Sequence, residues 1–510
     1  MLMLAGCRTN DKNPGSGSAS QPNIIYILAD DLGYGELGAY GQKRIETPHL
    51  DALASRGMVF TQHYAGAPVC APSRCVLLTG RHMGHAAIRG NDEWASRGEV
   101  WDYAKAVQDP LLEGQRPLPG DHPTLGSLLQ NVGYKTAIVG KWGLGAPLSE
   151  GIPSNRGFDF FFGYNCQRQA HTYYPRHLWK NQEKVWLDNP LVVPGTKLEP
   201  GEDPYDEESY RRYTLRNYAP DLMQEEVLHF IRSNRDRPFF LYYATPIPHA
   251  PLQAPEEWID YYVEKFGNDQ PYDGSNGYFP CRYPKATYAA MVSYLDEQVG
   301  QIIHLLKELD MEDHTLVIFS SDNGPTYNGG THSSWFGSAN PFSSEYGKGK
   351  GFVREGGIRV PMIATWPGII QPGTRSDHLS AFYDVLPTLC EVAGAGIPKD
   401  IDGISFLPTL KGRKQRYQNE YYYWEFPEYG GQIAIRKGNW KGIAREIKER
   451  NEVRFELYDL KKDPLEENDL APQYPGVIEE FMGIIRKEHT EAEIEKFRMT
   501  PLGDMIQVND

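Results

Sequence analysis

The sequence has few cysteines and no long apolar run. Its six cysteines include no C-x-x-C pair and follow no regular framework, so neither a zinc ribbon nor a disulfide scaffold is expected. Isolated disulfides stay open, because sequence alone cannot pair cysteines. No stretch reaches the roughly 18 to 20 apolar residues that a membrane-spanning helix needs.

An excess of basic residues is also absent. The formal net charge is −15, which argues against a general nucleic-acid-binding protein, since such proteins displace counterions with a basic surface. The charge does not exclude a small anionic substrate, because a few local cations can dominate inside a cleft.

What remains is the composition of a large globular protein. The 510 residues are 40% hydrophobic and 12% aromatic, and a chain of this length has room for more than one core. The composition changes past Lys411, where a basic run precedes alternating apolar and polar residues. We therefore predict a large unit over residues 21–411 and a smaller one over residues 412–510.

Residues 1–20 carry a feature of their own. Leu4-Ala5-Gly6-Cys7 resembles a bacterial lipobox, and a Gly/Ser-rich tether follows it. The apolar run before Cys7 is short and carries no basic residue, so an accidental match is the alternative. The pattern favours a lipid anchor on Cys7 and a bacterial cell-envelope location, periplasmic or on the outer membrane.

Four short apolar runs indicate strands buried on both faces, as in a parallel sheet. They occupy residues 23–28, 135–140, 238–244 and 315–320. Helical patterns lie between them, which predicts an α/β fold with a large mixed, mostly parallel sheet sandwiched by helices. Towards the C-terminus, residues 420–426, 432–443 and 455–460 read as antiparallel strands. With a helix at residues 474–491, they predict a smaller antiparallel sheet.

Each of the four buried runs leads into polar residues: Asp30 and Asp31, Lys141, His249, and Asp322 with Asn323. Any one of these has an ordinary explanation, such as a solvated turn or a lysine that reaches solvent. The prolines around His249 favour a rigid, extended segment. Because carboxyl ends of parallel strands meet at one edge, we expect the four groups to form one site. Three carboxylates and an amide favour Ca²⁺, or else Mg²⁺, over zinc.

The segment Cys70-Ala71-Pro72-Ser73-Arg74 reads as the start of a helix. Pro72 suits a first turn and Ser73 could act as a cap. The functional alternative is a helix N-terminus that, with Arg74, faces an anion. The five residues alone do not decide between these interpretations.

The pattern C-x-P-S-R, with L-T-G-R following at residues 78–81, resembles the signature of the sulfatases. Further similar segments are D-D-L-G-Y-G from Asp30, G-K-W around Lys141, E-G-G from Glu355 and E-L-Y-D-L from Glu456. The resemblance spans most of residues 23–471 in matching order. It implies an alkaline phosphatase-like fold and hydrolysis of sulfate esters. In that family a maturation enzyme oxidises the cysteine to formylglycine, whose hydrate is the nucleophile.

The resemblance also implies roles for individual residues. Cys70 would be the formylglycine precursor and a metal ligand beside Asp30, Asp31, Asp322 and Asn323 from the strand ends. Arg74 would support the nucleophile, and Lys141, His249 and Lys350 would contact the sulfate. Lys350 is selected over Lys348 because it lies five residues before E-G-G. One departure is Gly143, where the family commonly has a histidine; His85, His171 or a metal-bound carboxylate could fill that role.

Residues near the signature and in the aromatic-rich stretch 157–174 are candidate substrate contacts: His85, Arg89, Asn91, Arg168 and His171. Residues 175–213 show no sustained period and are expected to form a surface excursion. The substrate is expected to be a sulfated carbohydrate, as for bacterial polysaccharide-degrading sulfatases, cleaved in an exo manner at a galacto-configured 4-sulfate. Two rivals stay open: a phosphoesterase or phosphonate monoester hydrolase of the same superfamily, and a non-catalytic sulfoglycan-binding lipoprotein.

Overall fold

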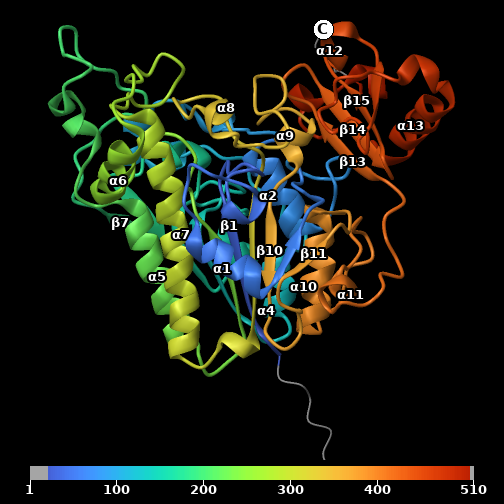
Figure 1. Ribbon diagram of the computed structural model, residues 1–510, viewed down its shortest axis with the longest axis horizontal. Coiled ribbons are helices and arrows are strands. Elements are labelled where there is room, and N and C mark those ends of the chain that lie inside the picture. The colour runs from blue at the N-terminus through green and yellow to red at the C-terminus, as the bar shows by residue number, and fades with distance from the viewer. Residues whose placement is uncertain (1–20, 506–510) are drawn as a thin grey trace, which may run out of the picture.

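The computed structural model describes residues 21–505, and a ten-stranded sheet forms its centre (Figure 1). The strand order is β11-β2-β10-β9-β1-β8-β4-β5-β6-β7. The strands span β1 Asn23–Ala29, β2 Met58–Phe60, β4 Lys135–Lys141, β5 Phe160–Tyr164, β6 His177–Lys180, β7 Glu183–Trp186, β8 Phe239–Ala244, β9 Thr315–Ser321, β10 Met362–Thr365 and β11 Thr374–Ser376. The neighbours β9, β1, β8, β4 and β5 are mutually parallel, whereas β10 runs antiparallel to β9 and β2, and β6 to β5 and β7. A two-stranded sheet pairs β3 (His63–Tyr64) with β12 (Ser380–Ala381).

Helices cover both faces of the sheet. Successive side chains of its central strands point to opposite faces and are apolar, so both faces must be buried. Ile24 and Tyr26 of β1 share a core with α2, α4 and α10, and Ile25 and Ile27 share a second core with α1, α5 and α7. The helices span α1 Pro48–Arg56, α2 Cys70–Thr79, α3 Tyr103–Gln108, α4 Leu125–Gln130, α5 Ala219–Ser233, α6 Glu256–Phe266, α7 Pro284–Glu308, α8 Ser333–Phe336, α9 Glu355–Ile358, α10 Val385–Ala393, α11 Leu407–Leu410, α12 Ile447–Arg450 and α13 Pro475–Glu488. Burial on both faces explains why the central strands are continuous apolar runs.

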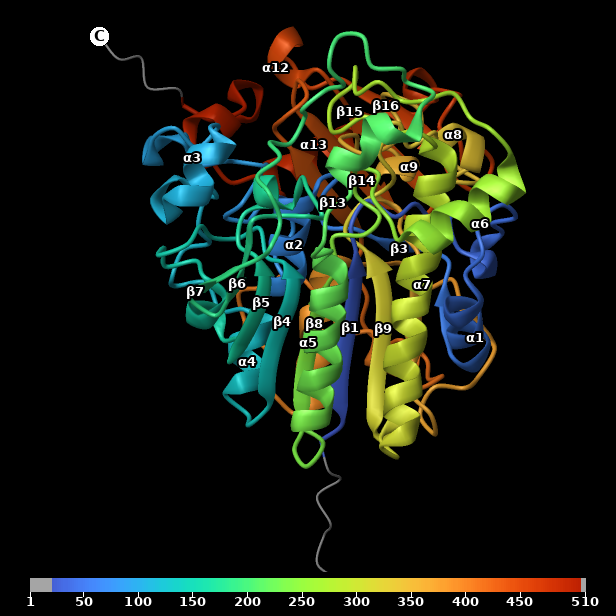
Figure 2. The ribbon, with the colours of Figure 1, turned by 90° about the vertical axis from the view of Figure 1, so that its left-hand side faces the viewer.

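A second sheet of four antiparallel strands follows, in the order β13 (Tyr422–Phe426), β14 (Gln432–Lys437), β15 (Trp440–Ala444) and β16 (Phe455–Asp459). Phe481 and Ile485 of α13 pack on the face that points away from the first unit, in one core with Ile433 and Leu457. The sheet lies beyond the carboxyl ends of the central parallel strands (Figures 1 and 2).

The second sheet is joined to the first unit through a buried lysine. Lys441 Nζ lies 2.8 Å from Glu355 Oε1 of α9 and 2.7 Å from Glu466 Oε1. All three side chains are buried. Since Lys350 lies only five residues before Glu355, this contact also fixes the segment that carries Lys350.

The predicted fold class is confirmed, with two differences in detail. Residues 175–213 were expected to be a surface excursion, but they contain β6 and β7, which extend the main sheet. The strands are four residues each, and β7 (EKVW) is half polar, so neither shows a buried-strand pattern. The amphipathic helix α6, which packs on α7, was also missed.

The five cysteines among the described residues are all free thiols, and Cys7 lies outside those residues. No helix in the described part of the chain is long and apolar enough to cross a membrane.

Candidate active site

The polar groups at the four strand ends meet at one edge of the sheet. Strands β9, β1, β8 and β4 are adjacent and parallel, so the residues after them lie side by side. Ala29 pairs with Ser321, which places Asp30 next to Asp322, and the Asp322 N–H donates to the Ala29 carbonyl at 3.0 Å. His249 follows β8 in a turn closed by its own N–H, which donates to Pro246 at 3.1 Å. The extended conformation expected for this segment was therefore wrong.

Helix α2 begins at Cys70 and directs it at the same edge. Cys70 Sγ lies 3.6 Å from Asp30 Oδ1. One turn later, Arg74 is fully buried and donates to Asp322 Oδ2 from Nε at 3.0 Å and from Nη2 at 2.8 Å. Ser73 does not cap the helix, because its hydroxyl donates to the Asp322 carbonyl at 2.5 Å. The start of α2 is therefore tied to the metal-ligand candidates of β9.

Three cationic or basic side chains approach the carboxylates from different elements. Lys141, the last residue of β4, forms an ion pair with Asp30. Lys350 Nζ lies 2.7 Å from Asp31 Oδ2, and His249 Nε2 lies 3.7 Å from the same oxygen. Lys350 is thus placed in the site, as its position before E-G-G predicts.

Burial and charge set the protonation of these groups. Burial alone would raise the pKa of Asp30, but Lys141 and the neighbouring cations outweigh it and hold that pKa below its usual range. Burial, with Asp30 nearby, raises the pKa of Asp322 to about 6. Burial, reinforced by Lys350, lowers the pKa of His249 to about 4, so the ring is neutral at pH 7. Burial also raises the pKa of the Cys70 thiol to about 12.

The oxygen atoms at this edge fit a hard cation. Asn323 Nδ2 donates to Asp31 Oδ1 at 2.8 Å. The buried Oδ1 of Asn323 has no hydrogen-bond partner among the described residues. Ligand atoms of Asp30, Asp31, Cys70 and His249 all lie within 4.8 Å of one another. Asp31 adopts a left-handed backbone, with φ of 65°, a conformation that is strained for an aspartate and common at functional sites. Carboxylate and amide oxygens are the ligands that Ca²⁺ and Mg²⁺ prefer.

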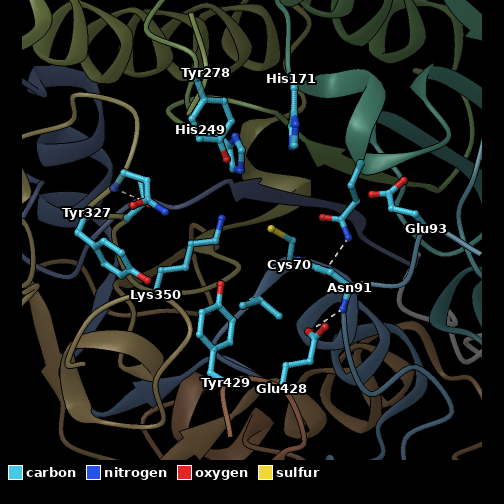
Figure 3. A pocket seen from close by; sticks show the side chains of 14 residues that line it. Cys70, Asn91, Glu93, His171, His249, Tyr278, Tyr327, Lys350, Glu428 and Tyr429 are labelled. Atoms are coloured by element: carbon cyan, nitrogen blue, oxygen red, sulfur yellow. Dashed lines mark hydrogen bonds between the residues drawn. The ribbon is translucent and has the colours of Figure 1, made fainter. Parts of the chain in front are cut away.

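A cavity of about 220 Å³ opens above Cys70 (Figure 3). His249 and Lys350 line it together with Cys70, and so do the predicted substrate contacts Asn91 and His171. Asn91 Oδ1 accepts the Ala71 N–H at 3.1 Å, so Asn91 also holds the first turn of α2.

The other three predicted substrate contacts lie outside this cavity. His85 Nδ1 lies 2.9 Å from Asp402, in a separate cavity that His82 also lines. Arg89 is buried in an ion pair with Glu425, 3.0 Å away, and joins the first unit to the second sheet. Arg168 packs over Trp101 and donates to its carbonyl at 2.8 Å. The chain bends after α2, which carries His85 and Arg89 away from Cys70.

Several residues that line the cavity escaped the sequence analysis. They are Glu93, Gln167, Tyr278, Thr326, Tyr327, Asn328, Glu428 and Tyr429. Gln167 begins a short 3-10 helix (Gln167–Ala170), and the others come from loops, where no periodic pattern marks a residue as facing a site. Glu428 and Tyr429 lie between β13 and β14, so the second sheet contributes to the cavity.

The environment of Gly143 explains why it carries no side chain. Its φ is +77°, and a Cβ atom there would approach Gln167 Cγ to 3.1 Å. His171 instead lies in the cavity, with its ring stacked on that of His249. Burial, together with His249 and Lys141, lowers the pKa of His171 well below its ordinary value.

Comparison with known proteins agrees with this geometry. The family described as Sulfatase matches residues 22–395, and N-sulphoglucosamine sulphohydrolase, C-terminal, matches residues 345–490. Human N-acetylgalactosamine-6-sulfatase is 32% identical over 406 residues, covering 78% of this chain and 67% of that protein. N-acetylgalactosamine-6-O-sulfatase of Bacteroides thetaiotaomicron is 28% identical, covering 96% of this chain and 97% of that protein.

Among solved structures, Ps i-CgsB superposes with a TM-score of 0.72 at 26% identity, covering 93% of this chain and 94% of that one. Its complex with k-i-k-neocarrahexaose gives 0.71 at 25% identity, with 96% of each chain covered. The family match spans far more than half of the chain and includes every strand end that carries a site residue. The chain therefore belongs to the sulfatase family, and it is a sulfatase enzyme.

Proposed function

We propose that this sulfatase removes sulfate from the terminal, galacto-configured sugar of a sulfated glycan. One observation carries the proposal: Cys70, Lys350 and His249 share a cavity of about 220 Å³, which suits the end of a chain better than its middle. An enzyme that cleaves within chains would need an open groove. The cavity therefore supports exo action.

Two groups would complete this site. Formylglycine made from Cys70 by a sulfatase-maturating enzyme would supply, when hydrated, one hydroxyl to attack sulfur and a second to expel sulfate. Ca²⁺, with Mg²⁺ as the alternative ion, would supply charge that stabilises the sulfuryl oxygens. Asp30, Asp31, Asp322 and the unpartnered Oδ1 of Asn323 would hold the ion.

The chain's own side chains then have distinct tasks. Arg74 holds Asp322 through two hydrogen bonds and fixes the start of α2 against the strand ends. Lys141 and Lys350 place positive charge where the sulfuryl group develops negative charge. Lys350 would hold the proton for the departing sugar oxygen, since it lines the cavity and stays protonated at pH 7. His249, the alternative donor, would first have to take up a proton, because its ring is neutral at pH 7.

The galacto configuration is supported by the names of two relatives, human and bacterial, that act on N-acetylgalactosamine sulfate. Those names specify the 6-sulfate, whereas the sequence favours a 4-sulfate. Both positions therefore belong in the test.

Aromatic side chains at the cavity mouth support a substrate longer than one sugar. Tyr327 and Tyr429 line the cavity, and Tyr327 packs edge-on against Tyr346 at 5.2 Å. Tyr346 is 73% exposed and also contacts Phe352. Exposed aromatic faces that continue from a cavity are typical of surfaces that bind a ligand. This aromatic rim would receive the sugars that follow the sulfated one.

The test is a panel of defined sulfated mono- and disaccharides, with galactosamine 4-sulfate and 6-sulfate, glucosamine 6-sulfate, an aryl sulfate and an aryl phosphate. We expect a galacto-configured sulfate to give the highest kcat/KM. A preference for aryl phosphate would favour the phosphoesterase or phosphonate monoester hydrolase instead. Protein from the native host whose intact mass shows an unconverted cysteine would favour the non-catalytic glycan-binding lipoprotein.

The cellular location is part of the proposal. A lipid anchor on Cys7 would hold the enzyme in the bacterial cell envelope, within reach of polysaccharide. Metabolic labelling with a fatty acid, compared between the wild type and Cys7→Ala, tests the anchor.

A further inference from the structure

Glu93 contributes a carboxylate to the cavity wall. No hydrogen bond or ion pair reaches its side chain within residues 21–505, and its Oε2 is buried. Its neighbour Asp92, in contrast, is paired with both Arg116 and Lys496. Burying a polar group without a partner costs free energy, so the unpaired Glu93 Oε2 needs an explanation. A bound ligand that donates hydrogen bonds is one.

The cavity divides its charges between two sides. Figure 3 shows Lys350 and Glu93 on opposite sides of Cys70. Lys350 and His249 form the side that would take the sulfate. Glu428, the second carboxylate of the lining, has one oxygen in use, since its Oε2 accepts the Asn91 N–H at 3.0 Å. The sugar would therefore meet acceptors on the side away from Lys350.

An ionised carboxylate can only accept hydrogen bonds. It suits sugar hydroxyl, amide or ammonium groups, and it repels a second sulfate or a uronic carboxylate held at short range. We propose that Glu93 is a specificity-determining residue, which selects a singly sulfated sugar with neutral or cationic donors beside the sulfate and rejects sugars with a second anionic group. The inference rests on the proposed glycan substrate.

The charge of Glu93 is set to change near neutral pH. Burial raises its pKa to about 7, and Asp92 adds to this, while Arg168, Lys141 and Lys496 oppose it. The side chain is then largely neutral at pH 6 and largely ionised at pH 8. Discrimination against a second sulfate should therefore grow with pH over this window.

The experiment compares kcat/KM for a monosulfated and a disulfated galactosamine that share the cleaved sulfate. Using the ratio cancels enzyme ionisations that affect both substrates equally. We expect the wild type to prefer the monosulfated sugar, increasingly so from pH 6 to pH 8. Glu93→Gln should lower the ratio by about tenfold to a hundredfold, the effect of losing one charged interaction, and should remove its pH dependence.

Two further variants separate charge from structure. Glu93→Asp keeps the charge, so it should keep the rise of the ratio with pH even if the protein is less stable. Glu99→Gln changes an exposed glutamate outside the cavity lining, paired with Lys105, and should leave the ratio unchanged.

A wild-type ratio near one, or an unchanged ratio in Glu93→Gln, would overturn the inference, while cleavage of the monosulfated sugar would still support the proposed function. Turnover of aryl sulfate without turnover of either sugar would overturn both.

Discussion

The imidazole rings of His171 and His249 are stacked, with centroids 5.6 Å apart and planes inclined by 14°. They come from different segments, and both line the cavity above Cys70. Since Gly143 carries no side chain and has a left-handed backbone, with φ of 77°, His171 is the side chain best placed to supply the histidine that the family commonly carries there. The pair thus offers two neutral nitrogen bases at one end of the cavity.

Replacing His171 tests this placement. We expect His171→Ala to lower kcat by about a hundredfold to ten-thousandfold, the usual range for a lost proton-transfer group. His85→Ala is the matched control, because His85 lies in a separate cavity beside Asp402. Steady-state kinetics with matched melting curves gives the answer. A large loss in the control, with activity kept in His171→Ala, would restore His85 to the site.

Cys70→Ala should abolish turnover while the fold is kept. The change removes only one sulfur atom, whose polar contact among the described residues is with Asp30 at 3.6 Å, so little stability is lost, while the reaction loses its proposed nucleophile. Cys75→Ala is the control, since the Cys75 side chain is fully buried in the apolar core and does not line the cavity. That variant should keep kcat and lose about 1 kcal/mol of stability. Residual turnover by Cys70→Ala, measured beside thermal unfolding, would refute this assignment.

Removing the proposed cation should lower the stability of the protein as well as abolish its activity. A ligand that binds only the folded state at 100 times its Kd adds about 2.7 kcal/mol. Adding Ca²⁺ to chelated protein should therefore raise Tm by a few degrees. Asn323→Ala removes the unpartnered oxygen and should shrink that rise. An equal Ca²⁺ shift in the wild type and the variant, by differential scanning fluorimetry, would place the ion elsewhere.

The aromatic rim should matter only for long substrates. Tyr346→Ala should leave kcat/KM for a sulfated monosaccharide unchanged and lower it for a tetrasaccharide by about fivefold to tenfold, the value of one stacking contact. Tyr417→Ala is the control, because Tyr417 is 76% exposed and does not line the cavity. If chain length does not change the effect of Tyr346→Ala, the rim does not bind sugar.

The buried Lys441 between the two sheets should contribute much more to the free energy of unfolding than the exposed Lys437. Lys441→Met leaves Glu355 with Arg359 as its remaining ion-pair partner and Glu466 with Arg354, 3.9 Å away. Removing one partner from a buried ion pair typically costs about 3 to 5 kcal/mol. Lys437→Met breaks a pair with Glu480 that is about 40% exposed, and such pairs are worth at most ~1 kcal/mol. Urea denaturation of both variants measures the difference. Equal losses would mean that Lys441 is not needed to hold the sheets together.

The strands and their polar ends were predictable because burial on both faces imposes a continuous apolar run. That pattern located β1, β4, β8 and β9, and parallel pairing then brought their ends together without any knowledge of contacts. The positions of Asp30, Lys141 and Asp322 follow from that rule. Lys350 lies in a loop, and its selection over Lys348 depended on the family resemblance.

The cavity wall was not predictable in the same way. Glu93, Tyr327 and Glu428 reach the cavity through loops whose path depends on tertiary contacts, such as the bond from Glu428 to the Asn91 N–H. His85 was expected in the site because it is close to Cys70 in sequence. The chain turns after α2, however, so that closeness does not bring the His85 side chain to the cavity. The half-polar β7 was missed because it lies at the edge of the sheet, where its side chains are exposed or half-buried and form no continuous apolar run.

The loop between β13 and β14 separates the residues proposed to contact the sugar from those proposed to act on the sulfate. Every side chain proposed to act on the sulfate comes from the first sheet, its helices or its loops, whereas Glu428 and Tyr429 come from the second sheet. Exchanging residues 429–431, with Glu428 kept to hold Asn91, would therefore alter which sugar is accepted and leave the reactive groups in place. An enzyme built in this way can acquire new substrates through mutations at Tyr429 and its neighbours in one short hairpin, without changing a side chain that holds the reactive groups.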